Sequence, residues 1–137
     1  MDDRILRALS RGHRIDITTT GRRTGLARRI ELVFHNLDGR IFVSGLPSRR
    51  RRSWLANLRA DPRFIFHLKG AIAADLPATA RIVTDETERR EVLARIARIW
   101  RRTDVDTMVA YSPLIEVLID DARPTPRTEE PPMPSIA

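Results

Sequence analysis

Residues 30–43 read IELVFHNLDGRIFV, two runs of alternating apolar and polar residues on either side of Asp38-Gly39. An Asp-Gly pair between two such runs is a strong signal for a β-hairpin closed by a two-residue type I′ turn. In that turn Leu37 faces Arg40, and continued pairing predicts Glu31 opposite Leu46. The stretch therefore predicts an antiparallel β architecture.

The same alternation predicts further strands on both sides of this hairpin. Ile15 and Ile17 alternate with polar residues, and so do the apolar residues of 64–69. A fifth strand is predicted from about residue 78 to residue 83, and a sixth over residues 114–120. Together with the hairpin strands, at 30–35 and around 41–43, these stretches give six short strands.

Two short helices are predicted between the strands. Residues 3–11 carry apolar residues at helical spacing and end near Gly12. Residues 54–60 form a two-turn connector, with Ser53 as its N-cap and Asp61-Pro62 as its stop.

A long helix is predicted after Asp85, which caps it, with Glu88 at the position that completes a capping box. Arg89 and three further arginines fall largely on its polar faces. Its apolar stripe, which we expect to pack on the core, consists of Val92, Leu93, Ile96, Ile99 and Trp100.

This order of elements predicts a mainly β (α+β) fold, a small antiparallel barrel with two to four helices. We expect residues 1–121 to form one domain, because a chain of 137 residues with 42% hydrophobic residues builds a single core. Residues 122–137 are rich in proline, and we expect this tail to be disordered or loosely packed.

The composition narrows the functional class. The net charge is +7, and Lys69 is the only lysine, so arginine supplies the excess. A basic balance of this kind favours anionic ligands. The chain has no cysteine, which excludes disulfides, thiolate metal sites and cysteine nucleophiles. Without an apolar run of membrane-spanning length, we expect a cytoplasmic protein, with peripheral membrane attachment left open.

Two arginine clusters mark the predicted binding site. Gly21-Arg22-Arg23-Thr24-Gly25 sets arginines on a turn whose glycines let backbone N–H groups face an anion, and Arg49–Arg52 form a second cluster. The predicted hairpin register brings Arg28 near Arg49 and Gly25 near Arg52, so both clusters share one end of the hairpin. Their mutual repulsion favours a bound phosphate-bearing ligand; the alternative is a solvated rim of arginines.

The usual catalytic constellations do not occur. The sequence has no Gly-x-Ser-x-Gly, Walker or Gly-x-Gly-x-x-Gly motif. His13, His35 and His67 are dispersed, and we predict no metal site. An enzyme of this kind acts through a cofactor that the protein positions.

An ordered series of motifs resembles one known family. The series comprises residues 17–25 (ITTTGRRTG), Arg28, the Asp38-Gly39 hairpin, Trp54 with Asn57-Leu58, and Ala60-Asp61-Pro62. It resembles the deazaflavin (F420)-dependent nitroreductases, also called F420H2-dependent quinone reductases. The likeness is strongest from about residue 15 to residue 84.

The resemblance implies a split β-barrel of the FMN-binding, pyridoxamine-phosphate-oxidase-like type. It implies that F420 binds in a groove, its phosphate and oligoglutamate tail held by basic residues, and that the reduced cofactor gives a hydride to a quinone, nitro compound or other activated small-molecule acceptor. The spacing leaves FMN open as an alternative cofactor. The expected cofactor-binding residues are Arg22, Arg23, Thr24, Gly25, Arg28, Ser44, Ser48, Arg49, Arg50, Arg51, Arg52, Trp54 and Asn57.

Three features differ from the family pattern. The loop before Trp54 is short and basic, and the serine expected at the end of the third strand is Leu46, with Ser44 and Ser48 nearby. Family members place several tyrosines between the long helix and the last strand, where this chain has only Tyr111, our candidate acceptor contact.

Two other functions remain open from the sequence. One is a non-catalytic protein that binds F420, a flavin or an apolar acid such as a fatty acid on the same barrel. The other is nucleic-acid binding, which the basic pI favours; with aromatics at only 5% of the chain, we expect no nucleic-acid partner. The sequence is compatible with a monomer or a homodimer.

Overall fold

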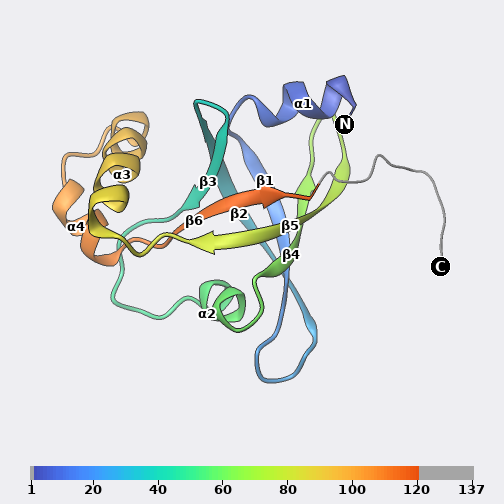
Figure 1. Cartoon of the computed structure of the whole chain (residues 1–137), viewed down its shortest axis with the longest axis horizontal. Helices are drawn as coiled ribbons and strands as arrows, with labels where there is room; N and C mark the ends of the chain where they lie inside the picture. The colour runs from blue at the N-terminus through green and yellow to red at the C-terminus, as the bar shows by residue number, and fades with distance from the viewer. Residues whose placement is uncertain (1, 121–137) are drawn as a thin grey trace.

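Six antiparallel strands form a closed barrel in the computed structural model, which describes residues 2–120 (Figure 1). The strands are β1 (Arg14–Thr20), β2 (Ala27–Leu37), β3 (Arg40–Ser44), β4 (Arg63–Leu68), β5 (Ala74–Ile82) and β6 (Leu114–Ile119). They follow the order β1-β2-β3-β6-β5-β4 around the barrel. The antiparallel barrel predicted from the sequence is confirmed, whereas the proposed tail at 122–137 and the domain boundary at 121 lie outside the described residues.

Four helices accompany the barrel: α1 (Asp3–Leu9), α2 (Ser53–Ala60), α3 (Glu86–Trp100) and α4 (Val105–Tyr111). In Figure 1, α3 and α4 lie together on one side, α2 lies at a second side and α1 at the opposite end from α2. Within the described part of the chain, no helix combines the length and the apolar character needed to cross a bilayer.

The β2–β3 turn has the predicted geometry. Asp38 and Gly39 have φ of 56° and 90°, the positive values that a type I′ turn requires, and Leu37 pairs with Arg40. The predicted pairing of Glu31 with Leu46 is wrong, because the β2–β3 ladder stops at Phe34 opposite Val43 and β3 ends at Ser44. The chain leaves the sheet just before Pro47, which has no N–H to donate to a ladder.

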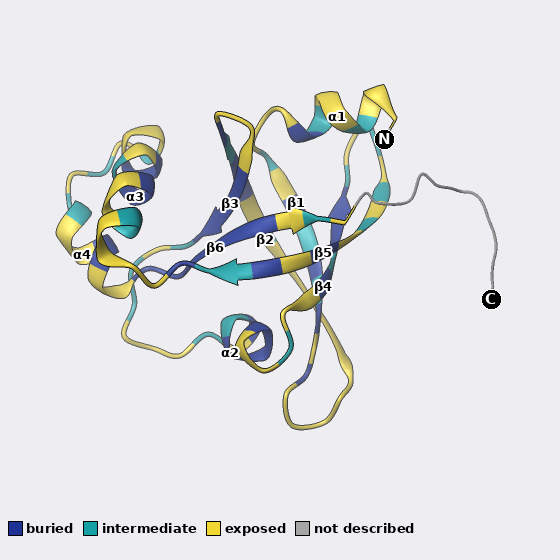
Figure 2. Cartoon of the chain, viewed as in Figure 1, coloured by how far each residue is buried: buried dark blue, intermediate teal, exposed yellow. Residues whose placement is uncertain are grey.

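Alternating side chains fill the barrel. Ile15 and Ile17 from β1, Phe34 from β2 and Phe66 from β4 are completely buried in its interior. Phe34 and Phe66 meet edge to face with ring centroids 5.3 Å apart, which is a favoured aromatic arrangement. The barrel therefore has a packed interior, and Figure 2 shows the buried segments along its strands.

A second apolar cluster joins the barrel to α3 and α4. Leu93 and Ile96 of α3 pack with Met108 of α4. The predicted apolar face of α3 is confirmed at Val92, Leu93 and Ile96, but Ile99 is 56% exposed. Trp100, the last residue of the predicted stripe, is partly buried and packs against this cluster, so only Ile99 departs from the prediction.

The helix termini differ from the prediction in two details. Arg52, rather than Ser53, is the N-cap of α2, and it makes no side-chain capping bond. At α3 the Asp85 carboxylate accepts the Glu88 N–H at 2.9 Å as predicted, but the Glu88 side chain binds arginines of the barrel.

Strand β5 starts at Ala74, earlier than the predicted residue 78. It includes Pro77, which pairs with Ile65 of β4.

Candidate functional site

The turn between β1 and β2 is a compact, hydrogen-bonded loop. Gly21 donates its N–H to the Leu26 carbonyl and Gly25 donates to the Gly21 carbonyl, both at 2.8 Å. Gly25 has a φ of 72°, a left-handed conformation that glycine adopts without steric cost. The loop therefore displays Arg22 and Arg23 at the surface from a fixed backbone.

A buried amide on α2 holds this turn. Asn57 is only 3% exposed, and its Oδ1 accepts hydrogen bonds from the Arg22 backbone N–H at 3.1 Å and from Arg22 Nη1 at 3.0 Å. Its Nδ2 donates to the Thr19 hydroxyl at 3.1 Å. Asn57 thus orients the guanidinium of Arg22 while it fixes α2 against β1.

A cavity of about 400 Å³ opens between this turn and α2, and we call it the turn cavity. The indole of Trp54, only 6% exposed, forms part of its wall. The predicted site residues that line it are Arg22, Arg23, Thr24, Arg28, Trp54 and Asn57.

The loop between β3 and α2 has its own set of local contacts. Ser48 donates its N–H to the Tyr111 carbonyl at 3.2 Å and accepts the Arg50 N–H on its hydroxyl at 3.0 Å. The Arg52 guanidinium donates to the Leu46 carbonyl, and burial lowers the pKa of Arg52. These contacts tie the loop to the end of α4.

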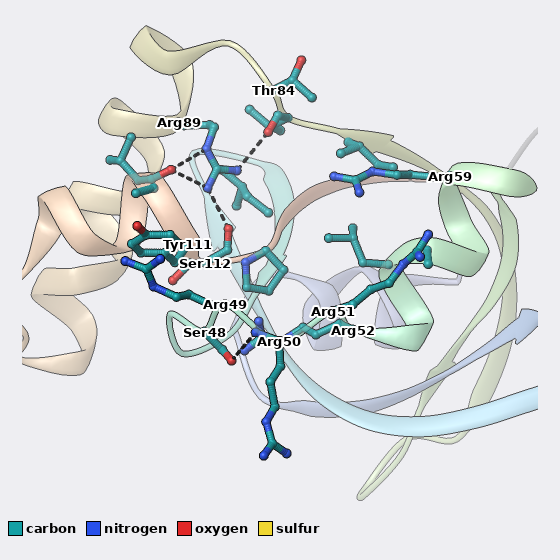
Figure 3. A pocket seen from close by; sticks show the side chains of 18 residues that line it. Ser48, Arg49, Arg50, Arg51, Arg52, Arg59, Thr84, Arg89, Tyr111 and Ser112 are labelled. Atoms are coloured by element: carbon teal, nitrogen blue, oxygen red, sulfur yellow. Dashed lines mark hydrogen bonds between the residues drawn. The ribbon is translucent and has the colours of Figure 1, made fainter.

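A second cavity, of about 570 Å³, lies behind this loop, and we call it the loop cavity (Figure 3). The Arg49 guanidinium lies 4.7 Å from the centroid of the Tyr111 ring, within the range of a cation–π contact. The predicted site residues that line the loop cavity are Ser48, Arg49, Arg50, Arg51, Arg52 and Tyr111.

Arg89 of α3 forms part of the same cavity. Its guanidinium donates to the carbonyls of Val83 at 3.0 Å, Val109 at 2.8 Å and Ser112 at 2.7 Å, and burial lowers its pKa (Figure 3). From the sequence we predicted that Arg89 lies on a polar face of its helix. The only signal in the sequence was an arginine close to the start of an amphipathic helix, which is not specific for such a role.

The two arginine clusters do not share one end of the hairpin, so this part of the prediction is wrong. Arg28 lines the turn cavity and Arg49 the loop cavity, and the two cavities have no lining residue in common. They adjoin along α2 and its start, where Arg52, Leu55 and Ala56 line the loop cavity and Ser53, Trp54 and Asn57 line the turn cavity. The cause is the early end of β3, which sends the loop toward α4 instead of along β2.

Both cavities are lined by arginines, all but one of which have no acidic partner from residues 2–120. No Asp or Glu lines either cavity, and of their arginines only Arg29 forms a salt bridge, with Asp16 at 2.9 Å. Each cavity is therefore a region of positive potential that favours an anion.

Two predicted site residues lie outside both cavities. The buried Ser44 hydroxyl donates to the Pro113 carbonyl at 2.6 Å, and Gly25 lines a separate cavity with Thr20, Ala27 and Asp61. Ser48, by contrast, is a lining residue, so of the two serines near the end of the third strand it is the one available to a ligand.

The histidines have separate structural contacts. His67 bridges three strands, with Nδ1 2.7 Å from Asp75 and Nε2 2.7 Å from the Thr18 hydroxyl. The ring of His35 packs against Trp100, and burial lowers the pKa of His35. Within residues 2–120, no three His, Cys, Asp or Glu side chains come together as a metal site.

Solved structures with the same architecture place the fold in a class. A putative pyridoxamine 5′-phosphate oxidase from Listeria innocua matches with a TM-score of 0.61 at 13% identity, covering 87% of this chain and 93% of that one. A FAD-binding protein from Mesorhizobium loti matches at 0.60 and 13%, covering 88% and 91%. A conserved hypothetical protein from Mycobacterium tuberculosis matches at 0.63 and 20%, covering 87% and 81%. The protein is thus a split β-barrel of the pyridoxamine-phosphate-oxidase-like type, as predicted.

The family follows from the sequence match. Residues 2–119 match the F420H(2)-dependent quinone reductase family, which is nearly the whole of the described chain. The chain belongs to this family, and the resemblance drawn from its motifs is confirmed.

Proposed function

We propose that this protein is an F420H2-dependent oxidoreductase that passes a hydride from the reduced deazaflavin to a quinone, nitro compound or other activated acceptor. Membership in the F420H(2)-dependent quinone reductase family supports the reaction class. The observation that carries the proposal for this chain is the turn cavity, which the buried Asn57 and Trp54 also line. Three of its arginines, Arg22, Arg23 and Arg28, have no carboxylate partner in the described part of the chain.

The turn cavity suits the acidic part of the cofactor. The phosphate and oligoglutamate tail that the family resemblance implies is a chain of anions, and Arg22, Arg23 and Arg28 offer guanidinium groups at one opening. Asn57 holds Arg22 in place before any ligand arrives, which lowers the ordering cost of binding.

The ring of the cofactor then belongs beside the first turn of α2, between the turn cavity and the loop cavity. The bound cofactor supplies the hydride, and the chain's own residues bind and orient it. Trp54 forms an apolar wall on the side of the tail, and Ser48 and Tyr111 lie on the other side, where an acceptor enters. This division gives the donor and the acceptor adjoining sites.

Fluorescence titration of F420 and, separately, FMN at two salt concentrations tests the proposal. We expect F420 to bind more tightly than FMN and to weaken as salt rises, because screening reduces attraction between exposed charges. The double variant Arg22→Gln/Arg28→Gln should lose about tenfold or more in affinity, since two charge-assisted contacts are removed. A matched control, Arg98→Gln/Arg101→Gln, removes two exposed arginines that line neither cavity and should bind normally.

Turnover separates this function from a non-catalytic carrier on the same barrel. Oxidation of bound F420H2 by a quinone or nitroaromatic acceptor, followed by absorbance, is expected for the enzyme. A protein that binds F420 tightly and never oxidises it with any acceptor would be a carrier. Equal binding of F420 by the Arg22→Gln/Arg28→Gln variant and by wild type would contradict the assignment of the tail to the turn cavity.

A further inference from the structure

The loop cavity is lined by more arginines than the turn cavity, which we propose binds the tail of the cofactor. Six of its lining residues are arginines, namely Arg49, Arg50, Arg51, Arg52, Arg59 and Arg89. Figure 3 shows that they come from the β3–α2 loop, from α2 and from α3. Within residues 2–120 none of the six forms a salt bridge, whereas the barrel arginines Arg40 and Arg81 are both paired with glutamates.

Five of the six arginines fall into two groups by their contacts. Arg89 and Arg52 donate to backbone carbonyls and so form the fixed, positively charged wall of the cavity. Arg51 and Arg59 are exposed, and Arg49 lies over the Tyr111 ring, so their guanidinium groups keep donors for a ligand. The cavity therefore combines a permanent positive field with exposed guanidinium donors.

Apart from Ser48, Thr84, Tyr111 and Ser112, the remaining lining is apolar. Leu55, Ile82, Val109 and Leu114 contribute aliphatic surface, and the lining contains no Asp or Glu among the described residues. A flat conjugated molecule is accommodated by such walls, but a neutral one leaves the arginines to repel one another without compensation. A ligand that joins a conjugated body to a carboxylate satisfies both parts of the cavity.

We propose that the acceptor of this enzyme is a conjugated carboxylate, an aromatic or α,β-unsaturated acid that carries its reducible group on the same skeleton. Arg49, Arg51 and Arg59 bind the carboxylate, and the aliphatic walls hold the conjugated body beside the cofactor. The inference rests on the proposed function, since it names the acceptor class of that reaction. For a nitro acid, F420H2 gives up a hydride and a proton, the nitro group becomes a nitroso group, water leaves and F420 is released oxidised.

The test compares 4-nitrobenzoate with 4-nitrobenzamide, which have the same ring and nitro group and differ in charge. Calorimetric titration without cofactor measures binding directly. We expect the acid to bind about tenfold or more tightly than the amide, as a charge-assisted pair predicts, and the difference to shrink at high salt. The Arg51→Gln/Arg59→Gln variant should lose the preference for the acid, and Arg98→Gln/Arg101→Gln should keep it.

Cofactor titration of the same variants separates the two proposals. The Arg51→Gln/Arg59→Gln variant should bind F420 with affinity close to wild type while its kcat/KM for 4-nitrobenzoate falls to that for the amide. If it loses F420 affinity as strongly as Arg22→Gln/Arg28→Gln, the loop cavity holds the cofactor tail and the acceptor assignment is overturned, although the reductase function stands. Equal binding of acid and amide by wild type also overturns it. Selective binding of the acid by a protein that never binds F420 refutes the reductase function and the acceptor role together.

Discussion

Two arginines on the side of the barrel that faces α3 are paired with glutamates, whereas within residues 2–120 most arginines that line the two cavities beside α2 form no salt bridge. Arg40 of β3 and Arg81 of β5 both donate to Glu116 of β6, with Nε–O distances of 3.0 Å, and both also contact Glu88 of α3. Around the turn and loop cavities, the arginines meet backbone carbonyls, an amide or an aromatic ring. Arg40 and Arg81 thus join β3, β5 and β6 to α3, whereas most arginines that line the two cavities have no carboxylate partner within residues 2–120.

Arg89 lines the loop cavity and also joins α3 to the residues around α4, so its removal should have the largest effect. Arg89→Met leaves the buried carbonyls of Val83, Val109 and Ser112 without this donor, and an unsatisfied buried group costs about 1–3 kcal/mol. We expect a loss of about 3 kcal/mol in the free energy of unfolding, measured by urea denaturation.

A neighbouring arginine provides the control for this experiment. Arg90→Met on the same helix removes an exposed residue whose partners, Glu86 and Asp106, are also exposed, and it should change stability far less. Similar losses in the two variants would mean that Arg89 acts only through its charge and not through its fixed hydrogen bonds.

The glutamates of the barrel should make stability depend on pH. Hydrogen bonds from Arg40, opposed in part by burial and joined by those from Arg81, hold the pKa of Glu116 below its ordinary value of 4.5, and Arg81 does the same for Glu88. A carboxylate whose pKa is lowered by folding stabilises the protein above its unfolded pKa, and this contribution is lost as the pH falls through the folded pKa. Stability should therefore decline below about pH 5.

Glu116→Gln tests this explanation. The variant keeps the shape of the side chain but cannot ionise, so it should lose about 2 kcal/mol at pH 7 from weakened charge-assisted hydrogen bonds. Between about pH 5 and pH 3, the range in which ordinary carboxylates titrate, the unfolding free energy of the variant should also fall less steeply than that of wild type. An unchanged pH slope would assign acid sensitivity to other carboxylates, such as Asp16, whose pKa is lowered by Lys69 and Arg29.

The fold was predictable because its signals are local. The Asp38-Gly39 turn depends on two residues that adopt positive φ, and the alternation of Ile15 with Ile17 follows from the two-residue period of a strand. The end of β3 was harder to predict from the sequence. It depends on Pro47 and on the hydrogen bond between Ser48 and Tyr111, two residues that are far apart in the sequence.

The site was predictable in its residue types and less so in its arrangement. The motif around Arg22 pointed to an anion, but its contact with Asn57 depends on how α2 docks against β1. The seven-residue helix α4 was not predicted, because a segment so short has little periodicity, and the role of Arg89 depends on carbonyls at the end of that helix. The arginines that we expected in one cluster therefore line two cavities, because their positions depend on contacts that form only in the folded state.

Giving Arg22 a carboxylate partner tests more sharply whether arginines without such a partner bind the anionic ligand. In Asn57→Asp, a carboxylate of nearly the same shape faces Arg22, so the turn cavity acquires the pairing seen on the barrel. We expect the affinity for F420 to fall about tenfold, because the ligand must compete with an internal anion.

The matched variant Asn57→Ser removes the amide without adding charge. If both variants weaken F420 binding equally, the amide acts only by holding the turn, and the charge of Arg22 is not limiting. A loss confined to Asn57→Asp, measured by fluorescence titration at low salt, would support electrostatic recognition of the tail.

The smallest effect is expected where a paired arginine is fully solvated. Arg95 donates to Asp38 at 2.8 Å, across from α3 to the β2–β3 turn, and the Asp38 side chain is 80% exposed. Water and salt screen such a pair, so Arg95→Ala should change the melting temperature by no more than about 2 °C even though the ion pair is well formed. Calorimetry at low and high salt checks this, because any contribution should disappear as ionic strength rises. A large, salt-independent loss would mean that the turn depends on α3 for its shape, and that pairing on this side of the molecule supports the hairpin whose sequence specifies the fold.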